Sequence, residues 1–122
     1  MKYAVEIKSH LDGAISALQA AKEALEQGQN ETAVSRAFEV AFHTGSMLLL
    51  KEEIEPARHG DVITLLQQVF VEGRRLTKDQ GANLSWLFAL GKAEKSVSLE
   101  DAKKAVEIAD SFFQAARVIL ES

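Results

Sequence analysis

A basic side chain and an imidazole lie seven residues apart in the segment from Ser35 to Leu50, which reads SRAFEVAFHTGSMLLL. In a helix, seven residues make nearly two turns, so Arg36 and His43 project from the same side about 10 Å apart along the axis. An arginine can stabilise the charge of a phosphodiester, and a histidine can move a proton near neutral pH. The pair therefore predicts contact with a phosphodiester.

The same residues allow a structural interpretation, which spacing alone favours. Glu39 lies between the two and can pair with Arg36, while His43 can donate to a buried carbonyl oxygen. Charges inside a protein are normally paired in this way. Both interpretations stay open at the level of the sequence.

The element that must position these residues is an unusually apolar helix. Arg36, Glu39, His43 and Ser46 form one thin polar line, and nearly all other side chains from residue 35 to 50 are apolar. A surface helix shows the inverse pattern, an apolar stripe on a polar cylinder. We therefore expect a central helix, whose polar line is paired internally or faces a cleft or a second subunit.

Apolar residues recur at helical spacing along the rest of the chain, and no stretch alternates with a period of two. Gly28 suits the end of one helix, and Asn30, Asp61 and Ser98 suit the N-caps of later helices. Gly13, inside the first helix, is expected to mark the close approach of a neighbouring helix. The sequence predicts an all-α fold, an up-and-down four-helix bundle with one additional short helix, as a single domain over residues 1–122. The expected helices span residues 3–27, 31–53, 61–73, 79–92 and 98 to the end of the sequence.

The composition is that of an ordinary globular protein, with 122 residues, 47% apolar and 26% charged side chains. The absence of cysteine excludes disulfides, thiolate catalysis and cysteine-based zinc sites. No apolar run approaches the ~18 residues of a membrane span, and no signal-peptide core follows Met1. We therefore expect a cytoplasmic protein with no membrane contact.

The net charge of −4 is unevenly distributed, because residues 56–95 carry six basic and four acidic side chains. An acidic protein lacks the broad basic surface of a strong non-specific nucleic-acid binder. Only the middle segment offers a local basic set, which is more often simply a solvated face. Its members are Arg58, Arg74, Arg75, Lys78, Lys92 and Lys95.

Motifs for other chemistries are missing: the sequence has no phosphate-binding glycine loop, no HExxH and no nucleophile elbow. Glu6 and His10 lie one helical turn apart and could form half of a metal site. No matching carboxylate pair completes it. We therefore expect neither a metal ion nor another cofactor.

The run Ser35-Arg36-Ala37-Phe38-Glu39-Val40-Ala41-Phe42-His43 resembles the S-R-A-Y-Y-A-x-F-H signature of HEPN domains. It is most similar to a small bacterial and archaeal subfamily that is often encoded beside minimal nucleotidyltransferases. The segment from Ile54 to Ile63 resembles that subfamily's loop with a histidine followed by G-V-I/L. The residues from Ser98 to Asp101 are similar to its S-x-E-E/D start of the last helix.

The resemblance implies a helical bundle that usually dimerises, and an R-x4-6-H motif that cleaves RNA in active toxin members. Arg36 and His43 have that spacing. In many active members the motif belongs to a later helix, where the subfamily reads L-R-x-K-A-D-Y. Here Gly91, Lys95 and Ser96 replace the Arg, Asp and Tyr, so the resemblance implies a degenerate catalytic motif.

We accordingly expect a HEPN-like binding module of the toxin–antitoxin type. It is predicted to form a homodimer with a groove that faces a nucleotide or RNA, and to have a nucleotidyltransferase partner. One alternative is a metal-independent RNase toxin with Arg36 and His43 as catalytic residues; another is a structural helical protein without a ligand. Trp86 is expected in the core or at an interface. The predicted nucleotide- or RNA-binding residues are Ser35, Arg36, Glu39, His43, Arg58, His59 and Lys92.

Overall fold

The computed structural model describes residues 2–56, 60–93 and 96–121, and all regular structure in these ranges is helical. Three long helices form the body of the molecule: α1 (Ala4–Glu26), α2 (Asn30–Lys51) and α6 (Leu99–Glu121). Shorter elements connect α2 to α6: α4 (Val62–Leu66), the π-helical segment η1 (Gln67–Val71) and α5 (Lys78–Lys92). The all-α bundle predicted from the sequence is confirmed.

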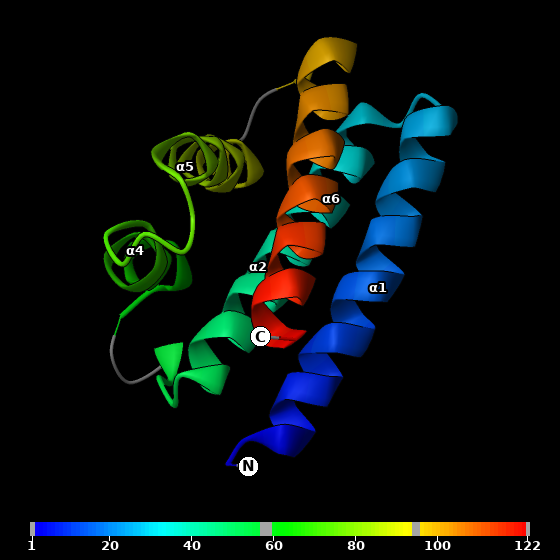
Figure 1. Ribbon diagram of the computed structural model, residues 1–122. Helices are drawn as coiled ribbons and strands as arrows, with labels where there is room; N and C mark the ends of the chain where they lie inside the picture. The colour runs from blue at the N-terminus through cyan, green and yellow to red at the C-terminus, as the bar shows by residue number, and fades with distance from the viewer. Residues whose placement is uncertain (1, 57–59, 94–95, 122) are drawn as a thin grey trace.

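The long helices α1, α2 and α6 run side by side, whereas α4 and α5 are seen nearly end-on in Figure 1. The two shorter helices therefore lie across the long ones rather than along them. Helix α2 occupies the centre, because it packs against α1, α4, α5 and α6. This is the central position that its apolar sequence predicts. No helix in the described part of the chain is both long enough and apolar enough to span a bilayer.

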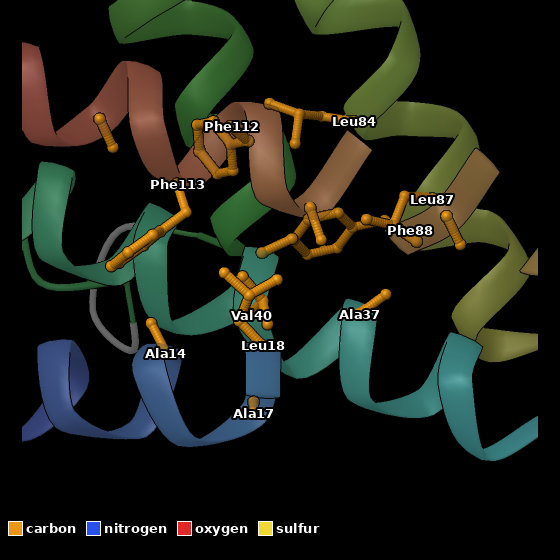
Figure 2. Packing of buried hydrophobic residues seen from close by; sticks show 14 of the residues in the cluster. Ala14, Ala17, Leu18, Ala37, Val40, Leu84, Leu87, Phe88, Phe112 and Phe113 are labelled. Atoms are coloured by element: carbon orange, nitrogen blue, oxygen red, sulfur yellow. The ribbon is translucent and has the colours of Figure 1, made fainter. Parts of the chain in front are cut away.

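The core is built from small side chains where α1 meets α2 and from large ones where α5 and α6 cover them. Ala14, Ala17 and Ala37 are buried on the first pair of helices, and their small size lets the two backbones approach closely. Figure 2 shows aromatic and leucine side chains of α5 and α6 gathered on the side of α2 that faces away from α1. These large side chains are Leu84, Leu87, Phe88, Phe112 and Phe113.

The turn between α1 and α2 ends the first helix as predicted but begins the second differently. Gly28 has a φ of 72°, its N–H donates to Leu25 O, and the N–H of Gln29 donates to Ala24 O. This is the Schellman arrangement, which favours glycine. The prediction that Asn30 is an N-cap is wrong: Gln29 holds that position, and the Asn30 side chain instead donates to Val97 O.

Side-chain caps begin the later helices. The predicted N-caps are confirmed, because Asp61 accepts from Thr64 N–H and Ser98 accepts from Asp101 N–H. Helix α5 begins at Lys78, one residue earlier than expected, since Thr77 and Gln80 form a capping box. The helix expected over residues 61–73 is shorter and changes to π-helical geometry at Gln67.

Candidate functional site on helix α2

Arg36 lies on the surface of α2 and is paired with a carboxylate of the same helix. Its Nη1 donates to both oxygens of Glu39, at 3.0 and 2.9 Å. The side chains of Arg36 and Glu39 are 46% and 40% exposed, so the ion pair is in contact with solvent. In the chain without a ligand, Arg36 is therefore paired with Glu39, as the structural interpretation of the sequence proposes.

His43 turns away from Arg36 and toward helix α1. Its Nδ1 lies 2.8 Å from Nδ1 of His10, and the two ring centroids are 5.1 Å apart. The ring also covers Gly13, where an added Cβ would lie 2.8 Å from His43 Nε2. Gly13 thus marks the predicted close approach of a neighbouring helix, and the expected partner of His43, a buried carbonyl, is replaced by another imidazole.

The hydrogen bond between the two imidazoles restricts their protonation. One Nδ1 must carry a proton and the other must offer a lone pair, so the contact cannot survive when both rings are cationic. Burial of His10 and, secondarily, the charge of His43 lower the pKa of His10 from its usual 6.5. The lowered pKa therefore favours a neutral His10 ring near pH 7.

No hydrogen bond or ion pair joins Arg36 to His43 in the described residues. Each is engaged by its own partner, Arg36 by Glu39 on α2 and His43 by His10 on α1. The two groups share a side of the helix, as their spacing predicts, but they are not directed at one point.

Phe42 separates two hollows in the surface beside the polar line. We call one the apolar hollow; its volume is about 330 Å³ and its lining is Phe38, Phe42, Pro56, Gly60, Asp61, Val62, Ile63, Phe88 and Lys92. We call the other the acidic hollow; its volume is also about 330 Å³ and its lining is Tyr3, Glu6, His10, Phe42, Ser46, Leu50, Glu55 and Pro56. Arg36 and His43 line neither of them.

Comparison with protein-family models gives one match, to the HEPN domain, over residues 7–121. The match covers nearly the whole chain. The chain belongs to the HEPN domain family. A search of curated proteins found no match.

In this HEPN domain, the position that resembles the arginine of the later motif has no room for a side chain. A Cβ added at Gly91 would lie 2.5 Å from Cδ2 and 2.9 Å from Cβ of Phe38. The ring of Phe38 is held there by an edge contact with Phe88, at a centroid distance of 5.0 Å. Glycine at this position therefore lets α2 pack directly against α5.

The remaining predicted binding residues are spread over the surface. Ser35 is exposed, and Lys92 is exposed at the apolar hollow. Arg58 and His59, and also Lys95 of the basic set, lie outside the described residues. Arg75 of the basic set is used locally, because it pairs with Glu52 and lies over the ring of Phe70.

Two features of the site were missed by sequence reasoning. The sequence gives no signal that pairs His10 with His43, because 33 residues separate them. Phe42 was assigned only to the apolar background of α2, yet it is 40% exposed. Trp86, expected in the core or at an interface, is half-buried under the amine of Lys104.

Glu6 and His10, which could form half of a metal site, gain no further ligands among the described residues. Both residues line the acidic hollow. No group of three or more potential metal-binding side chains occurs in residues 2–56, 60–93 and 96–121. A stable transition-metal site generally needs three or four such ligands, so the described residues do not assemble one.

Proposed function

We propose that this HEPN domain is a non-catalytic binding module of the cytoplasm. It acts as a homodimer with a groove that faces a nucleotide or RNA, and it works beside a minimal nucleotidyltransferase in a toxin–antitoxin type pair. Family membership supports the binding role, and the motif differences at Gly91, Lys95 and Ser96 favour the loss of catalysis.

The observation that carries the proposal is the separate engagement of the two candidate catalytic groups. Arg36 has to exchange Glu39 for a phosphate, and His43 has to leave His10 before its Nδ1 can transfer a proton. A general acid or base must be within hydrogen-bond reach of the reacting proton. The geometry of the free chain thus favours binding by Arg36 over cleavage by the pair.

The exposure of the ion pair between Arg36 and Glu39 supports a test of the RNase alternative. The ion pair between Arg36 and Glu39 is exposed, and exposed pairs contribute only about 0.2–1 kcal/mol. A phosphate can therefore displace the carboxylate at little cost. Whether cleavage then follows depends on the imidazole of His43.

A combined cleavage and binding assay separates these functions. Purified protein is incubated with labelled tRNA and a labelled single-stranded oligonucleotide, and Arg36→Ala and His43→Ala are assayed in parallel. We expect binding without cleavage, and weaker binding by Arg36→Ala. Cleavage that both substitutions abolish would establish the RNase instead. Neither binding nor a nucleotide-dependent rise in melting temperature would support the structural alternative, since a ligand of the native state must stabilise it.

The nucleotidyltransferase partner is tested by co-expression. If the chain's genomic neighbour is a minimal nucleotidyltransferase, a tag on that protein is expected to retain this chain during purification. Failure of the two to associate would remove the partner from the proposal and leave the nucleotide- or RNA-binding role intact.

A further inference from the structure

We infer that the ridge formed by Phe42 and Pro56 is the contact surface between two copies of this chain, with each Phe42 ring entering the apolar hollow of the other copy. The inference rests on the homodimer of the proposed function and specifies which face forms it. The ridge is defined by the two residues that line both hollows.

Phe42 is an exposed aromatic side chain beside the apolar hollow. It is the only aromatic side chain among the exposed large apolar residues of the described chain, and 40% of its surface is exposed in the part of α2 (residues 37–50) whose other residues are buried or half-buried. Edge contacts with His10 and His43, at centroid distances of 6.2 and 5.7 Å, hold the ring in place. A fixed aromatic group beside a pocket is typical of the residues that dominate protein interfaces.

The shape of this face suits a symmetric pair. In a two-fold dimer the same patch is used twice, so a projection on one copy must meet a hollow on the other. Here the projection and the hollow are adjacent: Phe42 stands beside a depression of about 330 Å³ that is lined mainly by apolar side chains. A two-fold axis that passes between them places each ring in the other copy's hollow.

The two sides of the ridge differ in charge. The acidic hollow is lined by Glu6 and Glu55, whereas the apolar hollow is lined by Lys92, whose charge is offset by that of Asp61. Glu6 and Lys92 are both exposed. Rotation about a two-fold axis brings one side of a patch against the other side, so Glu6 is directed toward Lys92 of the partner subunit. This complementarity favours a second copy over a nucleic acid as occupant, because the carboxylates of Glu6 and Glu55 repel phosphates.

The first test is the dissociation constant of the dimer, measured by analytical ultracentrifugation over a range of protein concentrations. Phe42→Glu is expected to raise this constant by about 10-fold or more, as for a central aromatic contact. Ile15→Glu is the matched control. Ile15 is 49% exposed on the same helix as Glu6, and nine residues place it on the opposite face; we expect no change in association.

The second test uses charge and does not depend on the aromatic residue. Glu6→Lys and Lys92→Glu are each expected to weaken the dimer, and the double variant E6K/K92E is expected to restore it. Recovery in the double variant requires that the two positions face each other. Because both side chains are exposed on helices, this test remains decisive if Phe42→Glu fails to fold.

The possible outcomes distinguish a wrong contact surface from a wrong proposal of a homodimer. A stable dimer in Phe42→Glu and in both single charge variants would overturn this surface but leave the homodimer in place. A wild-type chain that is monomeric at all concentrations would overturn both. Charge variants that lose RNA binding but keep their association would assign the face to RNA instead.

Discussion

At the scale of single residues, Glu39 controls how Arg36 meets an anion. Its two oxygens occupy the guanidinium in the free chain. Glu39→Gln removes that competing charge, so we expect affinity for single-stranded RNA to rise by up to about fivefold, the equivalent of the ~1 kcal/mol that an exposed ion pair can contribute. The measurement is a fluorescence-anisotropy titration at low salt.

A control for the Glu39 variant is Glu31→Gln, which changes the net charge equally at the beginning of the same helix. It is expected to alter affinity less than Glu39→Gln. Equal gains from the two variants would show that only the total charge matters, and would remove the specific role of Arg36.

The imidazole of His10 makes the stability of the folded chain depend on pH. The pKa of His10 is lowered in the folded chain, first by burial and then by the charge of His43. The unfolded chain therefore binds more protons as the pH falls below about 6.5, and stability is expected to fall through that range toward the lower folded-state pKa. Tyr3, Glu6 and Glu55 line the same hollow as His10; a nearby carboxylate favours a cationic imidazole, so burial sets the direction of the effect.

Urea unfolding between pH 7.5 and 5.5 measures this dependence, with His10→Gln as the comparison. The variant is expected to lose part of the slope in that window. The lowered pKa of Asp61, caused by the hydrogen bond from Thr64 N–H, acts at more acidic pH and does not contribute there. An unchanged slope in His10→Gln would show that His10 is not the titrating group.

At this scale the sequence predicts contacts within one helix better than contacts between helices. The spacing of Arg36 and Glu39 is sufficient to expect their ion pair, since residues three apart share a helix face. The spacing of His10 and His43 contains no such information, because only the packing of α1 on α2 brings them to 2.8 Å. The exposure of Phe42 likewise depends on where the neighbouring helices end.

At the scale of elements, the contact between α2 and α5 depends on Gly91. A methyl group there would overlap the ring and the Cβ of Phe38. We expect Gly91→Ala to lower the free energy of unfolding by about 1–3 kcal/mol, as overpacking does. Chemical denaturation measures the loss.

The same substitution in a Phe38→Ala background is the control for Gly91→Ala, because loss of the ring removes the nearest contact, at 2.5 Å, and leaves only the contact with Cβ at 2.9 Å. There we expect Gly91→Ala to cost clearly less than in the wild type, a non-additivity that reports direct contact. Equal costs in the two backgrounds would place the strain elsewhere.

The start of α5 offers a second prediction at this scale. The hydroxyl of Thr77 accepts from Gln80 N–H at 3.0 Å, and the Gln80 side chain accepts from Thr77 N–H at 2.7 Å. Thr77→Ala removes the cap and is expected to cost about 0.5–2 kcal/mol in thermal unfolding, whereas Thr77→Ser retains the hydroxyl and should cost less. A serine variant as unstable as the alanine variant would contradict the role of the hydroxyl.

Element boundaries were predictable where a local signal dominates. Gly28, Asp61 and Ser98 act at helix ends as their types indicate. The capping box at Thr77 is present in the sequence as T-x-x-Q, but the helix was expected to begin at Asp79. The change from α to π geometry at Gln67 has no sequence signal of its own. It coincides with contacts across to α5, where Gln67 donates to Gly81 O and Ser85 Oγ.

At the scale of the whole molecule, the net charge of −4 limits how RNA can bind. With about two phosphate contacts, the logarithm of the binding constant should fall with the logarithm of salt concentration at a slope of about −1.4 for a single strand. Arg36→Ala is expected to reduce that slope by about 0.7. A slope several times steeper would indicate a broad basic surface, in conflict with the local one expected here.

The class of fold followed from the sequence because helical periodicity and capping residues extend along the chain. The arrangement of the helices did not, since periodicity gives the buried face of a helix and not its direction. For that reason the crossing of α4 and α5 over the long helices was not expected. The central position of α2 was expected, because an almost wholly apolar helix is stable in water only when neighbouring helices cover it.

That central position has a consequence during synthesis on the ribosome. Lys51, at the end of α2, donates to the backbone of Leu120, which follows 69 residues later. At roughly 5–20 residues per second, α6 is completed about 3–14 s after α2. Until then, the side of α2 that packs against α6 remains exposed on the nascent chain. A ribosome-associated chaperone that binds apolar segments is therefore expected to crosslink to residues near Leu48. It is expected to dissociate once translation ends.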